Sequence, residues 1–215
     1  MGTQLELRVF AENEASATTA EATVLGEIDR LNNILSTYRP DSELSRWLEA
    51  GETVTVSDDL RNVLKASELW HQKSSGAFHP GVELISQLWR ASEKSGTVPA
   101  DSDLASAVAK LKTSPWTWSG AKVKPAGYAL TFNALAKGYI IDKACDRAMQ
   151  TAGVQFVSIN IGGDLRFAGS KPQRVVVRTE SRSGDDRILD TLQLQNQSMA
   201  TSGPQFRGFD IGGQH

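Results

Sequence analysis

Residues 154–168 read VQFVSINIGGDLRFA, and the character of the chain changes there. Two apolar runs of strand length, Val154–Ile161 and Leu165–Ala168, are joined by paired glycines that allow a tight turn. Further strand-like runs follow, separated by Gly, Pro, Asp and Ser residues, at 174–178, 189–194 and 206–211. The back of the chain is therefore predicted to be a mostly antiparallel sheet.

The front of the chain is predicted to be mainly helical. Alternation of Leu5, Leu7 and Val9 with polar residues indicates one early strand. After it, apolar residues recur with helical spacing, and Ser42 and Ser57 are placed to cap two of the helices. Another capped helix is expected around Ser102–Leu111. The predicted helices lie within residues 14–36, 42–48, 57–69, 82–89, 102–111 and 135–149. Because helices and strands segregate instead of alternating, the predicted fold class is α+β and not a doubly wound sheet.

Two local features complete this prediction. Residues 128–132 are expected to form a strand, and Gly153 is expected to end the preceding helix as a left-handed cap. A strand at 206–211 would be followed by a Gly212-Gly213 turn and then by the end of the sequence. We therefore expect one domain over residues 1–215 that is truncated before its C-terminal segment.

Composition excludes several classes of protein. The chain has 215 residues, of which 40% are hydrophobic and 22% charged, as in ordinary folded domains. The net charge is −2 with scattered basic residues, which argues against nucleic acid as a partner. No apolar run reaches the roughly 18 residues that a membrane helix needs. Cys145 is the only cysteine, so there is no internal disulfide or multi-cysteine metal site.

Common catalytic fingerprints are missing, but three segments are unusual for their chemistry. Residues 133–139, NALAKGY, bring Lys137 and backbone N–H groups to a strand-to-helix junction, where they can meet an anion. The alternative is an ordinary solvated lysine. Residues 160–164, NIGGD, permit close approach of another backbone or simply form a hairpin. Residues 200–203, ATSG, offer hydroxyls to a polar ligand or to a turn.

In their order and spacing, these segments resemble the ApbE family of FAD:protein FMN transferases. The resemblance covers nearly the whole chain, and it is carried by residues 1–3 (MGT), 35–39 (LSTYR), 75–80 (SGAFHP), 131–139 (TFNALAKGY), 161–164 (IGGD) and 200–203 (ATSG). It implies a two-lobed, T-fold-like α+β architecture with FAD in the cleft. Relatives continue past the position of His215 into a segment with an activating histidine and acidic metal ligands.

The resemblance implies an enzyme that transfers FMN from FAD to a Thr or Ser hydroxyl of a target protein, with Mg²⁺, and releases AMP. The alternatives are a protein that stores FAD, an FAD pyrophosphatase without protein transfer, and a noncatalytic structural domain. The family resemblance also implies a periplasmic location or a membrane anchor on the outer face of the inner membrane, although this chain shows no signal for either.

Site residues follow from the same resemblance, position by position. The residues implied to bind FAD are Met1, Tyr38, Ala77, Phe78, His79, Thr131, Lys137 and Thr201. The backbone carbonyl of Ala134 is implied to face Mg²⁺, and no catalytic residue is identified. For Tyr38 and Phe78 the alternative is core packing, and for His79 it is a surface loop. Thr131 stands where many relatives carry aspartate, so a polar contact is kept there without its charge.

Overall fold

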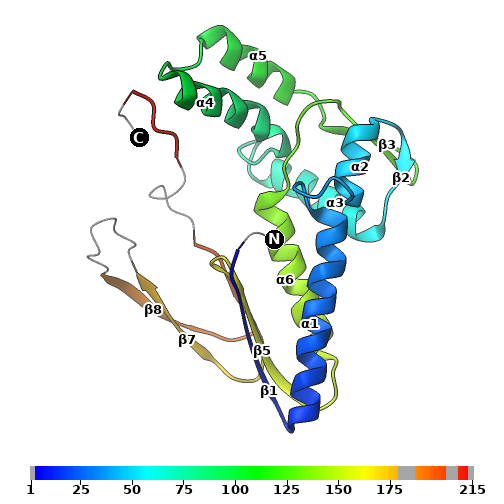
Figure 1. Ribbon diagram of the computed structural model, residues 1–215, viewed down its shortest axis with the longest axis vertical. Helices are drawn as coiled ribbons and strands as arrows, with labels where there is room; N and C mark the ends of the chain where they lie inside the picture. The colour runs from blue at the N-terminus through cyan, green and yellow to red at the C-terminus, as the bar shows by residue number, and fades with distance from the viewer. Residues whose placement is uncertain (1–2, 179–186, 202–207, 213–215) are drawn as a thin grey trace. The chain divides into compact units, whose positions relative to one another are not determined.

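A computed structural model describes residues 3–178, 187–201 and 208–212. Its elements, in chain order, are β1 (Leu5–Ala11), α1 (Glu14–Leu35), α2 (Glu43–Ala50), β2 (Val54–Thr55), α3 (Asp58–Lys73), the 3-10 helix η1 (Pro80–Val82), α4 (Glu83–Ser95), α5 (Asp101–Leu111), β3 (Trp116–Ser119), β4 (Lys122–Pro125), α6 (Asn133–Met149), β5 (Val154–Ile161), β6 (Asp164–Gly169), β7 (Gln173–Arg178), β8 (Ile188–Leu194) and β9 (Ser198–Met199) (Figure 1).

The elements form two compact units, which are described separately. Unit 1 comprises Met1–Arg30 and Lys137–Arg207, and unit 2 comprises Leu31–Ala136 and Gly208–His215. The division falls inside α1 and α6, so each of these helices contributes residues to both units. Within the described part of the chain, no helix combines the length and apolar character needed to cross a bilayer.

Unit 1 is organised around an antiparallel sheet with the order β1-β5-β6-β9. Figure 1 labels its strands β1 and β5. Exposure alternates along β1 because only one of its faces is covered. In the central strand β5, four consecutive residues, 156–159, are buried. The β5–β6 hairpin is closed by Gly162 and Gly163, with Ile161 opposite Asp164. The predicted hairpin at residues 154–168 is thus confirmed.

The buried side chains of unit 1 come from two helices and the sheet. The apolar ones include Ala20, Val24, Ile28, Ile140, Ile141, Ala144, Cys145, Ala148, Phe156, Val157, Ile159, Ile161, Phe167 and Ala168. One carboxylate joins them, because the Glu27 side chain is only 2% exposed. Its Oε1 lies 2.7 Å from Nη2 of Arg30 and its Oε2 lies 3.0 Å from Nη1 of Arg147, so α1 and α6 are neighbours here.

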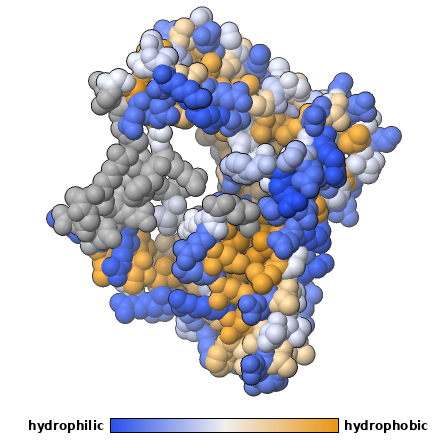
Figure 2. Space-filling view, viewed as in Figure 1, coloured by the Kyte–Doolittle hydropathy of each residue, from blue (hydrophilic) through white to orange (hydrophobic). Residues whose placement is uncertain are grey.

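A separate two-stranded sheet, β7-β8, completes unit 1. Figure 2 shows apolar surface gathered over the strands of this unit. Among the exposed large apolar side chains of these strands are Phe10, Ile188 and Leu189. The Nζ of Lys171 lies 3.3 Å from the centre of the Phe10 ring, so this ring carries a cation on one face.

Unit 2 contains helices α2 to α5 and a small sheet whose strand order is β2-β4-β3. Aromatic residues link its parts. The indole Nε1 of Trp47 donates to the carbonyl of Val123 at 3.2 Å, and its ring meets that of Trp116 edge to face at 6.5 Å. Trp116 also lies 5.9 Å from the ring of Phe132, just before α6. These contacts hold the β3–β4 hairpin against the helices.

Three local predictions were wrong. Residues 128–132 form no strand. Leu130 and Phe132 are nevertheless buried, which is the alternation of buried side chains expected of a strand. The helix at 101–111 follows Ala100, which makes no side-chain cap. Helix α6 ends at Met149, so Gly153, with φ of 80°, belongs to the turn before β5.

In the last predicted strand, 206–211, residues 206–207 lie outside the described residues. The following residues, 208–210, have no strand conformation. Ile211 makes an isolated bridge.

Candidate functional site

In unit 2, three of the segments that carry the family resemblance are joined by hydrogen bonds. Asn133 Nδ2, at the start of α6, donates to the hydroxyl of Tyr38 at 3.3 Å. The backbone N–H of Thr131 donates to the carbonyl of Pro80 at 2.8 Å. Tyr38 itself is 81% exposed. The core-packing alternative for Tyr38 is therefore wrong, and its phenol ring is open to a ligand.

The loop at 75–80 is built on the C-terminal end of α3. Its Phe78 N–H donates to Oγ of Ser74 at 2.9 Å, and Nδ1 of His71 lies 2.8 Å from the Phe78 carbonyl. Phe78 is half-buried and Ala77 is exposed. The loop thus presents a partly open aromatic side chain, and its backbone is held by α3.

His79 is buried, with an exposed fraction of 9%, so it is no surface loop histidine. Its Nδ1 accepts from the N–H of Gly81 at 2.9 Å and so caps η1. Its ring meets that of His71 edge to face at 5.0 Å. Burial lowers the pKa of His79, and the neighbouring His71 lowers it further, against an opposing hydrogen bond at the backbone of Leu111. A neutral ring fits this position.

In unit 1, the later part of the same 131–139 segment meets the 161–164 segment through an ion pair. Nζ of Lys137, on α6, lies 2.7 Å from Oδ2 of Asp164, the first residue of β6. The two side chains are 26% and 25% exposed. The carboxylate orients the ammonium group while part of it stays open to solvent. The solvated-lysine alternative is therefore wrong in its simple form.

The backbone conformation of the turn before Asp164 is fixed by two glycines, a hydrogen bond and a close contact. Gly162 and Gly163 have φ of 58° and 91°, which favour glycine. Asn160 Oδ1 accepts from the Gly163 N–H at 3.0 Å. A Cβ on Gly162 would lie 2.5 Å from Oγ1 of Thr3, so the start of the chain lies against this turn. The NIGGD segment is therefore both a hairpin and a site of close approach.

The other residues that were predicted to bind FAD or Mg²⁺ lie in exposed or half-buried positions where the structure describes them. Thr201 is exposed and follows β9, whose Met199 pairs with Leu165 of β6. Ala134 is exposed in the first turn of α6. Thr131 is half-buried, and its Oγ1 accepts from the Asn133 N–H at 3.4 Å. Met1 lies outside the described residues.

The predicted site residues form two groups, one in each unit, and the two groups differ in chemistry. Unit 2 offers the aromatic rings of Tyr38 and Phe78, which suit a planar ring system. Unit 1 offers the ammonium group of Lys137 beside Asp164, which suits phosphate or ribose oxygens. We call these the ring cluster and the lysine cluster.

The described residues do not form a magnesium site by themselves. Among them, no three His, Cys, Asp or Glu side chains gather as metal ligands. The Asp164 carboxylate is engaged by Lys137, and Mg²⁺ prefers several oxygen ligands in octahedral geometry.

Sequence reasoning missed three residues that support these clusters. Asn133 holds Tyr38, Asp164 holds Lys137, and His71 lies against His79. Asn133 and Asp164 belong to the quoted segments, and that membership is the signal that could have found them. For His71, nothing in the sequence pointed to His79.

Comparison with known proteins identifies the family and the fold. The model of the ApbE family matches residues 1–215. A FAD:protein FMN transferase of Vibrio cholerae is 30% identical, with 89% of this chain and 61% of the relative covered. Another from Haemophilus influenzae is 24% identical, covering 94% of this chain and 63% of the relative. The chain thus spans slightly more than three fifths of the length of these relatives.

Solved structures show the same fold. A flavin transferase ApbE from Vibrio cholerae superposes with a TM-score of 0.77 at 22% identity, covering 100% of this chain and 75% of that one. The ApbE protein from Thermotoga maritima gives a TM-score of 0.81 at 23% identity, covering 99% and 71%. The predicted α+β architecture is confirmed.

Proposed function

This chain belongs to the ApbE family, and we propose that the protein is an enzyme that transfers FMN from FAD to a Thr or Ser hydroxyl of a target protein. The proposal treats residues 1–215 as one flavin transferase domain. Relatives named FAD:protein FMN transferase support it.

One observation carries the proposal beyond the family name. Segments far apart in the sequence meet in each unit, and each meeting includes a residue predicted to bind FAD. The ring cluster joins Tyr38 to the start of α6, and the lysine cluster joins Lys137 to the β5–β6 turn. A structural domain without a ligand has no need for a largely exposed tyrosine that is held by an amide.

In the proposed reaction, the hydroxyl oxygen of the acceptor attacks the phosphorus atom of the FMN moiety. A new P–O bond forms, the P–O–P bond of FAD breaks, and AMP leaves with the bridging oxygen. The hydroxyl proton passes to a base that is not identified among the described residues. Lys137, oriented by Asp164, binds phosphate oxygens and stabilises the charge that develops on them.

FAD and an acceptor protein are thus the proposed substrates, and Mg²⁺ is kept as a proposed cofactor. When bound, the ion would supply positive charge at the diphosphate. The proposed location, periplasmic or anchored on the outer face of the inner membrane, can be checked by fractionating cells that express the natural protein.

The test is to incubate the protein with FAD, MgCl₂ and a flavin-acceptor domain. We expect AMP release together with flavin fluorescence that stays on the acceptor in a denaturing gel. The same domain with its acceptor threonine changed to valine is the matched control, and EDTA tests the need for the ion. Labelling of the valine control would contradict transfer to a hydroxyl.

The other outcomes identify the alternatives. Free FMN and AMP without labelled acceptor would indicate an FAD pyrophosphatase. Tightly bound, intact FAD would indicate storage. Absence of FAD binding would overturn a flavin function altogether.

A further inference from the structure

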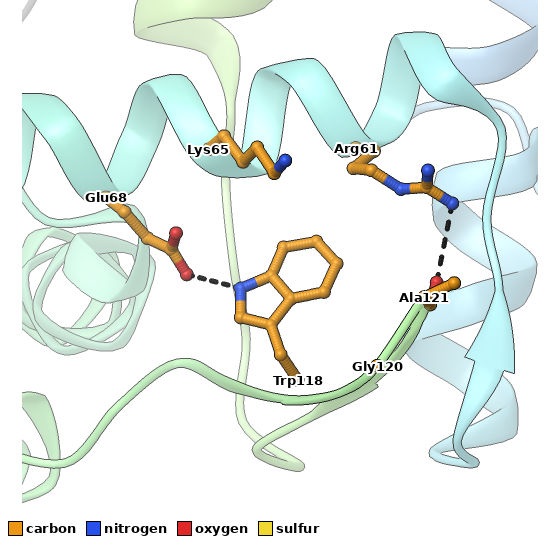
Figure 3. A pocket seen from close by; sticks show the side chains of 6 residues that line it. All are labelled: Arg61, Lys65, Glu68, Trp118, Gly120 and Ala121. Atoms are coloured by element: carbon orange, nitrogen blue, oxygen red, sulfur yellow. Dashed lines mark hydrogen bonds between the residues drawn. The ribbon is translucent and has the colours of Figure 1, made fainter.

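A hollow in unit 2 lies outside every segment that carries the family resemblance. It is formed between α3 and the hairpin of β3 and β4, and it has a volume of about 340 Å³ (Figure 3). Its lining residues are Arg61, Lys65, Glu68, Trp118, Gly120 and Ala121. This volume lies at the lower end of the range for small-molecule sites.

Helix α3 contributes three charged side chains to the hollow. Arg61, Lys65 and Glu68 follow one another at spacings of four and three residues, so they share one face of the helix. In Figure 3 the Trp118 ring points from the hairpin toward this face, with Lys65 and Arg61 beside it. The hollow therefore has charged groups along one wall and an aromatic ring on the other.

The Trp118 ring is held in place. Its Nε1 donates to Oε1 of Glu68 at 2.7 Å, and Nε1 of Trp116 donates to the same oxygen at 2.6 Å. Trp116 is fully buried, whereas Trp118 is half-buried. The two indoles thus use the Glu68 carboxylate to fix an open aromatic surface.

The other end of the hollow is positively charged. Arg61 donates through Nη2 to the carbonyls of Val56 and Ala121, each at 3.4 Å, and its Nη1 lies 3.3 Å from Asp58. The Asp58 side chain is 90% exposed, so solvent screens this pair. The side chain of Lys65, on α3, makes no ion pair or hydrogen bond within residues 3–178, 187–201 and 208–212, which are those described.

Arg61 also has a side-chain nitrogen without a hydrogen-bond partner. Nε of Arg61 is buried and has no hydrogen-bond partner among the described residues. Buried polar groups are normally satisfied, by protein, water or a ligand. This Nε is itself closed to solvent, so a negative group in the hollow would be held by Lys65 and by the part of the Arg61 side chain that is open, 26% of it.

We propose that this hollow binds a small aromatic carboxylate. The ring of the ligand lies on the Trp118 indole, and its carboxylate lies between Lys65 and Arg61. An inorganic anion would use the cations alone and leave the fixed aromatic surface uncovered. Because the hollow is open to solvent, we expect weak binding, with a dissociation constant on the order of 1 mM.

Benzoate is the probe that tests the proposal. It is titrated against ¹⁵N-labelled protein while the indole N–H signals are recorded, and the Trp118 signal is identified with the Trp118→Phe variant. We expect a saturable shift of this signal with benzoate and a much smaller effect with equal inorganic phosphate. Cyclohexanecarboxylate, which has the charge without the aromatic face, should bind more weakly than benzoate.

The decisive variant is Lys65→Gln, which should weaken benzoate binding about fivefold, the effect of losing one partly screened charge pair. Lys73→Gln is the matched control, because Lys73 lies on the same helix with its Nζ 5.6 Å from the centre of the Trp70 ring but does not line the hollow. Equal weakening in both variants, or a shift that never saturates, would overturn the proposal. Thermal unfolding of both variants checks that the fold is kept.

Discussion

Lys137 and Asp164 form an ion pair with an Nζ to Oδ2 distance of 2.7 Å, although one lies on α6 and the other at the start of β6. A lysine ammonium group carries three donors, and one carboxylate oxygen occupies only one of them. Both side chains remain about one quarter exposed. The pair therefore orients Lys137 and leaves donors for a second anion.

The first prediction concerns this lysine and FAD. Lys137→Met should weaken FAD binding about tenfold, because one charge-assisted hydrogen bond to a phosphate is lost. Equilibrium titration of the flavin fluorescence measures the affinity. Lys143→Met is the control, since Lys143 lies on the same helix, with its Nζ 5.5 Å from the centre of the Tyr139 ring. An equal loss of FAD affinity in the two variants would contradict a specific contact of Lys137, because it would depend only on the net charge of the protein.

The second prediction concerns pH. The pKa of His79 is lowered in the folded protein by burial and by His71. Below the usual value near 6.5, the unfolded chain therefore binds more protons at this position, and folding stability should fall as the pH is lowered through that value. His79→Asn keeps a cap for η1 but cannot titrate, so it should flatten this loss.

Thermal unfolding between pH 8 and pH 5 measures the effect of His79, with His71→Gln as a comparison. An unchanged pH dependence in His79→Asn would refute the assignment.

The third prediction concerns two glycines of the β5–β6 hairpin, Gly163 in its turn and Gly169 at the far end of β6, opposite Phe156. Gly169 has φ of 117°, and a Cβ there would lie 2.3 Å from the carbonyl oxygen of Gln155. Gly163 has φ of 91° but no atom near its Cβ position. Gly169→Ala should therefore cost more than about 2 kcal/mol of unfolding free energy, and Gly163→Ala about 1 kcal/mol. Urea unfolding compares the two, and equal costs would contradict the close contact at Gly169.

The fourth prediction concerns the only thiol of the chain. Cys145 is fully buried, and burial raises its pKa to about 12. The reactive thiolate is thus scarce at neutral pH and shielded from reagents. We expect very slow labelling by a thiol reagent at pH 8 in the folded protein and rapid labelling in denaturant. Fast labelling of the folded protein would show that α6 opens locally.

Much of the fold was predictable because its signals are local. Ser42 and Ser57 cap α2 and α3 as predicted, since their hydroxyl oxygens accept from Ser45 and Leu60 three residues later. The prediction at 128–132 failed for a physical reason. A period of two shows that alternate side chains are buried in an extended segment, and Leu130 and Phe132 meet that condition without a partner strand.

The sequence by itself determined the capped starts of α2 and α3, the glycine turn of the central hairpin and the segments that identify the family, because each depends on residues close together in the chain. Only the tertiary structure decided that Lys137 meets Asp164, that Asn133 holds Tyr38 and that Glu68 joins two tryptophans. Such contacts depend on strand register and on how helices pack, and many pairings of the same residue types satisfy the same local pattern.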